Sequence, residues 1–251
     1  MVTPDKQRAS NTQFWSRLGG KPLLEGARVL EVGCGFGRLS IDMALSGAKQ
    51  VIGIDITSKA IDVANNNLKQ NYPQLKNIVE FIKIDLKDFT EFNFDYIVSK
   101  DTFEHVLNLD EMINAIKMRL KPGGKLYTGF GPLWNSPFGP HGLIQGRQVI
   151  KNPVPWWHLL AGETRFINRY NRHYPKNKIN SVHEIGLNKL SMSDYRKLIH
   201  ASGLSVKYFE VNRGDNLALK AFELIRRLSV LEEYFSNNIY CICEKPSEFY
   251  S

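Results

Sequence analysis

The chain has 251 residues, of which 43% are hydrophobic and 23% charged, with a formal net charge of +8. This composition is typical of a folded globular protein and excludes a disordered chain, and the length fits one domain with insertions. It contains no run of 18 apolar residues, no apolar core near the N-terminus and only three cysteines. We therefore expect a cytoplasmic protein with no membrane span, secretory signal or disulfide framework.

The first 25 residues are predicted to form an N-terminal helical arm on a single domain that spans the whole chain. Phe14, Trp15 and Leu18 lie at helical spacing and would share one apolar face. The helix is expected to end before Pro22, because a pair of glycines precedes this proline.

Short apolar segments then alternate with helical segments along most of the chain. The predicted strands are residues 28–32, 50–55, 78–84, 94–99, 125–131, 204–211 and 238–244. The predicted helices are about residues 37–46, 58–70, 109–120, 191–202 and 217–228. This alternation favours a doubly wound α/β fold with a mostly parallel sheet and right-handed crossovers.

The alternation breaks in residues 132–190, which are rich in proline, glycine and aromatic residues. A structureless loop of this length is rare in a compact domain, so we expect an inserted lid with helices of its own over the active site. The segment contains eight Lys or Arg residues and only two Asp or Glu residues. This excess favours an anionic partner: an acidic small molecule, a membrane surface or a nucleic acid.

A glycine-rich turn follows the first predicted strand. It reads Glu31-x-Gly33-x-Gly35-x-Gly37, with Cys34 between the first two glycines. The dinucleotide pattern G-x-G-x-x-G fails in both registers, because Arg38 and Ser40 stand where the third glycine would be. A carboxylate at the strand end favours a cationic ligand over a diphosphate.

Over residues 28–131 these motifs resemble those of class I S-adenosylmethionine-dependent methyltransferases, in particular small-molecule O-methyltransferases of the ubiquinone-biosynthesis type. The resemblance implies a Rossmann-like, seven-stranded sheet whose last strand is antiparallel. It also implies S-adenosylmethionine as the cofactor, which carries a sulfonium and an ammonium but no phosphate.

The resemblance assigns cofactor contacts to the ends of the strands, where ligands bind in open α/β sheets. Asp55 is expected to accept hydrogen bonds from the ribose hydroxyls, although it could instead cap the next helix. Asp85 is expected to accept from the adenine amino group, with Leu86 packed on the ring. Ile56 and Ser99 complete the predicted cofactor-binding set.

The fourth predicted strand leads into Asp101-Thr102-Phe103-Glu104-His105-Val106, which resembles an Asp/Glu-x-x-Glu-His-Val segment of the same enzymes. In a helical turn Asp101, Glu104 and His105 would share one face. Such a group could bind Mg²⁺ or orient a nucleophile. It could also support the cofactor loop without any metal, and the sequence leaves these alternatives open.

His141 follows the fifth predicted strand, where an acceptor would approach the methyl group, and is a candidate general base. The predicted function is methyl transfer to an oxygen of a small-molecule acceptor, aromatic or anionic. A nucleic-acid methyltransferase is the main alternative, but the Asn/Asp-Pro-Pro-Tyr/Phe motif of its amino-methylating members is absent after the fourth strand. A noncatalytic binding module is less favoured, and the sequence does not determine the oligomeric state.

Overall fold

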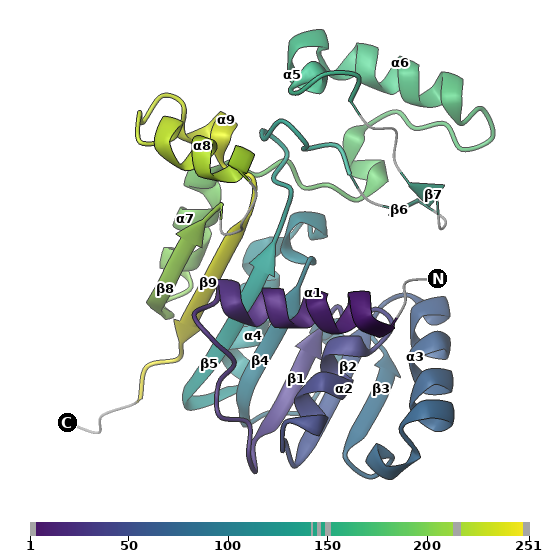
Figure 1. Ribbon diagram of the computed structural model, residues 1–251, viewed down its shortest axis with the longest axis vertical. Helices are drawn as coiled ribbons and strands as arrows, with labels where there is room; N and C mark the ends of the chain where they lie inside the picture. Colours follow the sequence, from purple (N-terminus) through teal and green to yellow (C-terminus); the bar gives the residue numbers. More distant parts are fainter. Residues whose placement is uncertain (1–3, 142, 145–146, 149–151, 213–216, 248–251) are drawn as a thin grey trace.

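The computed structural model describes residues 4–141, 143–144, 147–148, 152–212 and 217–247 (Figure 1). Its centre is a seven-stranded sheet in the order β3-β2-β1-β4-β5-β9-β8. The strands are β1 (Arg28–Val32), β2 (Gln50–Asp55), β3 (Val79–Lys83), β4 (Phe94–Lys100), β5 (Leu120–Phe130), β8 (Ser205–Val211) and β9 (Ile239–Glu244). In this sheet β9 runs antiparallel to its neighbours β5 and β8, and the other strand pairs are parallel, which confirms the predicted fold class.

Helices cover both faces of this sheet. The α-helices of the main body are α1 (Pro4–Arg17), α2 (Arg38–Leu45), α3 (Ser58–Asn71), α4 (Leu109–Arg119) and α7 (Met192–Ala201). Helices α1, α2 and α3 contribute to one buried apolar cluster, and α4 and α7 contribute to the other. Short 3₁₀ turns lie at Pro73–Leu75, Leu86–Asp88, Phe103–His105 and Val182–Ile185.

The predicted elements agree with the observed ones within a few residues, except at β5. This strand begins at Leu120, five residues before the predicted start at Lys125. Gly123 has a φ of 74°, and its amide donates to the carbonyl of Lys245 (2.9 Å). The residues expected to form a turn are therefore part of β5, because they pair with the segment that follows β9. Local sequence cannot show this pairing.

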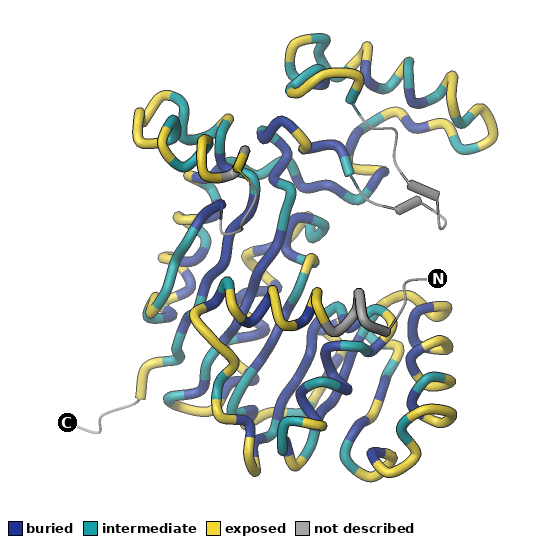
Figure 2. The backbone as a smooth tube through the Cα atoms, in the orientation of Figure 1, coloured by how far each residue is buried: buried dark blue, intermediate teal, exposed yellow. Residues whose placement is uncertain are grey.

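Residues 132–190 contain regular structure of their own: β6 (Leu143–Ile144), β7 (Arg147–Gln148), α5 (Trp157–Ala161) and α6 (Glu163–His173). Trp134, Phe166 and Tyr170 are buried in a third apolar cluster inside this insertion (Figure 2). Several of its aromatic residues thus form a small core. The helices α8 (Leu217–Ile225) and α9 (Glu232–Phe235) precede β9.

Among the described residues, no helix is both long and apolar enough to cross a membrane. The insertion and α8 lie beyond the carboxyl ends of the central strands (Figure 1). The strand order reverses between β1 and β4, so the crevice expected for a ligand opens at the ends of these two strands.

Candidate active site

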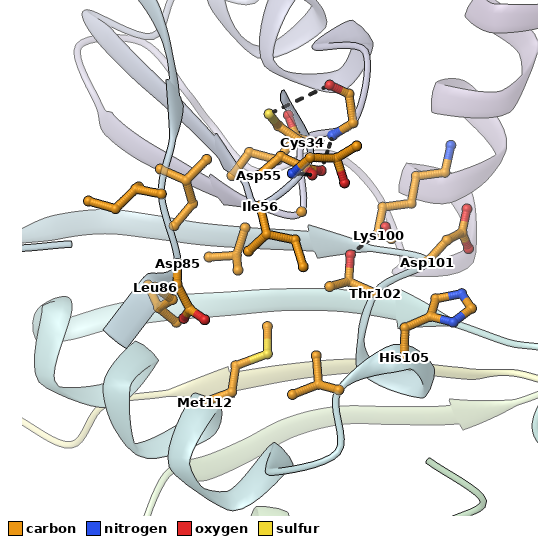
Figure 3. A pocket seen from close by; sticks show the side chains of 18 of the residues that line it. Cys34, Asp55, Ile56, Asp85, Leu86, Lys100, Asp101, Thr102, His105 and Met112 are labelled. Carbon is orange, nitrogen blue, oxygen red and sulfur yellow. Dashed lines mark hydrogen bonds between the residues drawn. The ribbon is translucent and has the colours of Figure 1, made fainter. Parts of the chain in front are cut away.

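A cavity of about 1080 Å³ lies at the carboxyl ends of β1, β2 and β4 (Figure 3). The glycine turn, Asp55 and Asp85 line one part of it, and Asp101 and His105 line another. Asp85 and His105 lie toward opposite ends of the view in Figure 3. The cavity is therefore large enough and polar enough at both ends to hold a cofactor beside an acceptor.

The turn after β1 has the tight geometry that its glycines predict. The amides of Gly33 and Cys34 both donate to the carbonyl of Ile54, at 2.9 and 3.0 Å. A Cβ on Gly33 would lie 2.3 Å from the Oγ1 atom of Thr102, so any side chain there would push the β1 and β4 ends apart. Gly33, Cys34 and Gly35 line the cavity.

Gly37 differs from Gly33 and Gly35 because it serves the packing of α2 and not the wall of the cavity. It begins α2 with a φ of 73°, and a Cβ there would lie 2.2 Å from the ring of Phe81. Gly37 is not among the described residues that line the cavity. Its requirement for glycine follows from backbone conformation and from packing between α2 and β3.

Asp55 is held rigidly at the end of β2. Its carboxylate accepts hydrogen bonds from the amides of Gly35 (2.9 Å) and Thr57 (2.8 Å). The first bond ties the glycine turn to β2, and the second closes the turn before α3. Thr57 is the N-cap residue of α3, so Asp55 does not itself cap that helix. A carboxylate has about four acceptor positions, so that of Asp55 retains capacity toward a ligand.

Glu31 is almost fully buried, at 2% exposure, and accepts a hydrogen bond from the hydroxyl of Ser40. Burial, opposed by the Ser40 bond and by the charge of Lys100, raises the pKa of Glu31 to about 8. In the absence of a ligand this carboxyl group is therefore mostly neutral at pH 7. A cation in the cavity would favour its ionised form. The preference for a cationic ligand that the sequence predicts for Glu31 therefore depends on ionisation when the ligand binds.

The remaining predicted cofactor residues differ in their surroundings. Asp85 is exposed and accepts from the amide of Lys87 (3.0 Å), while Leu86 is buried beside it. Ile56 is 71% exposed at the cavity wall. Ser99 is fully buried, is not among the described lining residues, and donates to the carbonyl of Val32 (3.0 Å). Its hydroxyl ties β4 to β1.

Asp101 and His105 lie beyond the end of β4, at the far end of the cavity. Asp101 has a φ of 51° and precedes the 3₁₀ turn Phe103–His105. The expected helical face shared by Asp101, Glu104 and His105 is therefore wrong, because the backbone turns sharply at Asp101. The Asp101 side chain keeps contact with solvent, but the protein around it removes part of the hydration of its carboxylate. This desolvation, together with the negative charge of Glu104, raises the pKa of Asp101 to about 6.

His105 points one edge of its ring at the insertion. Its Nδ1 atom lies 2.5 Å from the carbonyl oxygen of Gly186. A carbonyl only accepts, so Nδ1 carries the proton and Nε2 keeps its lone pair when the ring is neutral. Among the candidate bases, His105 is the histidine that lines the cavity in the described part of the chain.

Glu104, which is buried, and His141, which is half-buried, form a pair behind His105. The Nε2 atom of His141 lies 3.7 Å from Oε1 of Glu104, and the His141 ring centroid lies 5.2 Å from that of His105. His141 donates from Nδ1 to the carbonyl of Gly139 (2.8 Å). Burial lowers the pKa of His141, but Glu104 and the Gly139 carbonyl outweigh this effect, so the pKa lies above its ordinary value.

His141 does not occupy the open position expected from sequence. Its Nε2 atom is enclosed by protein and has no hydrogen-bond partner, and neither has Oε2 of Glu104. Glu104 uses Oε1 to accept from the amide of Gly131 (3.0 Å), so the carboxylate is fixed between β5 and the 3₁₀ turn.

The donor set does not fit Mg²⁺. Candidate ligand atoms of Glu104, His105 and His141 lie within 4.8 Å of one another, and Asp101 is not part of this group. Mg²⁺ prefers oxygen ligands at about 2.1 Å, which places neighbouring ligand atoms about 3 Å apart. Two imidazoles and one carboxylate at wider spacing match neither requirement.

Other residues of the site lie outside the predicted set. Asn188 of the insertion donates to the carbonyls of Phe103 (2.7 Å) and Val106 (3.0 Å), which holds the turn that carries His105. Lys100 donates to the hydroxyl of Ser10 (2.7 Å), so α1 closes one side of the cavity. These contacts join segments about 80 to 90 residues apart and leave no local sequence signal.

Comparisons with known proteins agree with this geometry. A family model described as a methyltransferase domain matches residues 23–129. The ubiquinone biosynthesis O-methyltransferase of Coxiella burnetii is 39% identical over 104 residues. That match covers 41% of this chain and 43% of the relative, so the chain aligns with less than half of the curated relative's length.

Solved structures resemble the fold over most of the chain. A putative S-adenosylmethionine-dependent methyltransferase from Listeria monocytogenes is 16% identical, with a TM-score of 0.62 and coverage of 94% of this chain and 99% of that one. Phosphoethanolamine N-methyltransferase 2 of Haemonchus contortus, in complex with S-adenosyl-L-methionine, is 17% identical with a TM-score of 0.59 over 95% and 53% of the two chains.

At these identities the solved structures show the fold, while the family match and the motif order show the domain type. The glycine turn, the acids at the ends of β2 and β3 and the strands β1 to β4 all belong to the same 107-residue region. Residues 23–129 therefore match a methyltransferase domain, and the sheet that contains them has the Rossmann-like fold of class I methyltransferases.

Proposed function

We propose that this domain transfers the methyl group of S-adenosylmethionine to a hydroxyl oxygen of a small-molecule acceptor, with His105 as the general base. The observation that carries the proposal is the position of His105 in the cavity wall, with Nδ1 bound to the Gly186 carbonyl. This bond leaves Nε2 able to accept a proton.

The cofactor and the acceptor divide the cavity between them in this proposal. Asp55 and Asp85 bind the ribose and the adenine, with Leu86 against the ring. The acceptor lies near Asp101 and His105. Glu31 lies near the end of β1, beneath the glycine turn. The positive charge of the bound cofactor would lower the raised pKa of Glu31 and so favour its ionised form.

The reaction needs alignment and removal of one proton, because the sulfonium already activates the methyl group. The acceptor oxygen attacks the methyl carbon, the carbon–sulfur bond breaks and S-adenosylhomocysteine leaves. The hydroxyl proton passes to Nε2 of His105. The Glu104 and His141 pair lies behind the ring, where its carboxylate would stabilise the imidazolium that forms.

We propose that residues 132–190 act as the lid of the acceptor end. Gly186, Asn188 and His141 all come from this insertion and contact the turn that carries His105 or Glu104. The described residues of the insertion do not line the cavity itself. They would therefore act through the turn and by covering the bound acceptor.

An anionic acceptor and a nucleic acid are the weaker alternatives. Asp101 and Glu104 are acidic groups at the acceptor end, whereas Arg165, Arg172 and Lys176 of the insertion are exposed and are not lining residues of the cavity. A noncatalytic module is disfavoured because the geometry for cofactor binding at Asp55 is complete.

Methyl transfer from S-adenosylmethionine labelled in the methyl group with tritium tests the proposal. The protein is incubated separately with a small-molecule extract and with total RNA. We expect label in small molecules, in a product stable to mild acid as an ether or phenyl ether would be. Label found only in RNA would reject the small-molecule acceptor, and the Asp55→Ala variant serves as the background control.

We expect this activity to be independent of Mg²⁺, because the donor set of Glu104, His105 and His141 does not suit that ion. The initial rate should change by less than about two-fold after dialysis against EDTA and on addition of Mg²⁺, since His105 alone supplies the base. A ten-fold loss with EDTA that Mg²⁺ restores would show instead that the ion belongs to the mechanism.

A further inference from the structure

Helix α8 presents an apolar stripe to solvent. Leu217, Leu224 and Leu228 are 81%, 66% and 61% exposed. Leu217 and Leu224, both within α8, fall about 20° apart on the helix surface at about 100° per residue, and Leu228 follows the end of the helix. Leu228 belongs to the turn that continues α8, where the amide of Arg226 still donates to the carbonyl of Phe222 (2.9 Å).

The opposite face of α8 is packed against the protein. The ring of Phe222 lies 5.2 Å from that of Phe235 in α9 and 6.1 Å from that of Trp156 in the insertion. The Nε1 atom of Trp156 donates to the carbonyl of Tyr234 (2.9 Å). The exposed leucines therefore lie on the face of α8 that points away from this packing. Through the contact of Phe222 with Trp156, the surface of α8 is continuous with that of the insertion.

The insertion lies at the same end of the molecule as α8, and many of its residues are exposed (Figures 1 and 2). Leu160 of α5 is 78% exposed and Val154 before it is 53% exposed. The exposed cations of this region are Arg165, Arg172, Lys176 and Lys178 in the insertion and Lys220 and Arg227 beside the stripe.

The described acidic groups of α8 and α9 are bound within the protein. Glu233 accepts hydrogen bonds from the side chain of Asn135 (2.7 Å) and the amide of Met192 (2.8 Å). Glu223 pairs with Arg226 at 2.6 Å, and Glu232 pairs with Arg196, also at 2.6 Å. The exposed surface around the stripe therefore carries apolar side chains among cations whose charge is not neutralised by these acids. This combination is typical of helices that lie in the interface of an anionic membrane.

We propose that α8 and the adjoining surface of the insertion dock on an anionic lipid surface. Leu217, Leu224 and Leu228 would enter the boundary between headgroups and acyl chains, and Lys220 and Arg227 would contact the lipid phosphates. The surface lies beyond the carboxyl ends of the strands, so docking leaves the rest of the domain in water (Figure 1).

Two other occupants fit the surface less well. A second copy of the chain would bring like charges together around the stripe, which opposes association. RNA would use the cations, but it needs aromatic side chains for stacking rather than exposed leucines, and Trp156 and Phe222 are packed against each other.

Vesicle co-sedimentation tests the proposal on the full chain. We expect binding to vesicles of phosphatidylcholine with about one quarter phosphatidylglycerol, and at least about ten-fold weaker binding to phosphatidylcholine alone. The double variant Leu224→Asp/Leu228→Asp should weaken binding to the anionic vesicles about ten-fold or more. Leu23→Asp is the matched control, because Leu23 is 82% exposed but precedes β1 at the other end of the strands.

The proposal would be overturned if the protein did not bind anionic vesicles, or if the double variant and the Leu23→Asp control bound them equally. It would also be overturned if the protein bound RNA, the double variant kept that affinity, and vesicles did not compete with RNA for binding. A concentration-dependent dimer lost in the double variant would identify a second copy as the occupant instead. Calorimetric binding of S-adenosylmethionine, measured on each variant without vesicles, reports whether the fold and the cofactor site are intact, so failure here is separate from failure of the proposed methyl transfer.

Discussion

Replacing Asp55 by alanine is expected to weaken S-adenosylmethionine binding at least about 100-fold, because each hydrogen bond to a charged group contributes about 1.5 to 3 kcal/mol. The substitution removes the acceptor for the ribose hydroxyls in the proposed site. It also frees the amides of Gly35 and Thr57, which hold the glycine turn against β2. Isothermal titration calorimetry with S-adenosylmethionine and with S-adenosylhomocysteine measures the loss.

Two further variants make this result specific. Asp62→Ala removes an exposed carboxylate from the neighbouring α3 and should leave the affinity unchanged. Asp55→Asn keeps one acceptor oxygen but places an amino group beside a backbone amide donor. Its affinity for S-adenosylmethionine should therefore lie between those of Asp55→Ala and Asp62→Ala. An Asp55→Ala affinity within three-fold of the wild type, with normal thermal unfolding, would place the cofactor elsewhere.

Replacing His105 by glutamine is expected to lower kcat about 10² to 10⁴-fold, the range that general-base catalysis supplies. Glutamine can still donate to the Gly186 carbonyl and so preserves the turn, but it cannot accept the acceptor's proton near pH 7. The affinity for S-adenosylmethionine should change little, since binding of the cofactor depends on Asp55 at the other end of the cavity. Single-turnover kinetics with the acceptor found in the tritium assay measure the step.

The His141→Gln variant separates the two candidate bases, with His200→Ala on the exposed face of α7 as the control. We expect a smaller loss of kcat for His141→Gln than for His105→Gln, because Nε2 of His141 is enclosed beside Glu104. A larger loss for His141→Gln would make His141 the base.

The pH dependence of the Glu104 and His141 pair gives an independent readout. The pKa of His141 is raised, so this pairing stabilises the fold fully below the ordinary value of about 6.5 and the stabilisation is lost as pH rises through the folded-state pKa. Glu104→Gln should lower the pKa of His141 in an NMR titration. An unchanged pKa would contradict the pairing.

Local signals along the chain were sufficient for most of the fold. The runs at residues 28–32 and 50–55 have no competing helical pattern, and glycine or proline stands near the ends of the elements that follow. Alternation of such strands with helices restricts the topology to a right-handed, largely parallel sheet. The start of β5 was predicted late, because its first residues pair through Gly123 with the distant Lys245.

The positions of two acids in the cavity wall also follow from the sequence, since Asp55 ends β2 and Asp85 follows β3, and the carboxyl ends of these strands face the crevice. Asp55 and Asp85 needed only the positions of β2 and β3 to be placed. Ser99 shows the limit of this reasoning, because a strand-end hydroxyl can point at the neighbouring backbone instead of the ligand. The direction of a side chain at the last position of a strand depends on its register with the next strand.

By itself, the sequence determined the methyltransferase domain and its fold, because strand ends, glycine spacing and acid positions are properties of consecutive residues. Only the tertiary structure decided how His105, Glu104 and His141 are arranged, which side chains hold their turn, and where the apolar stripe of α8 faces. These features depend on contacts between segments such as Glu104 with His141 and Phe222 with Trp156. Such contacts are made by packing across the fold and leave no periodicity in the chain.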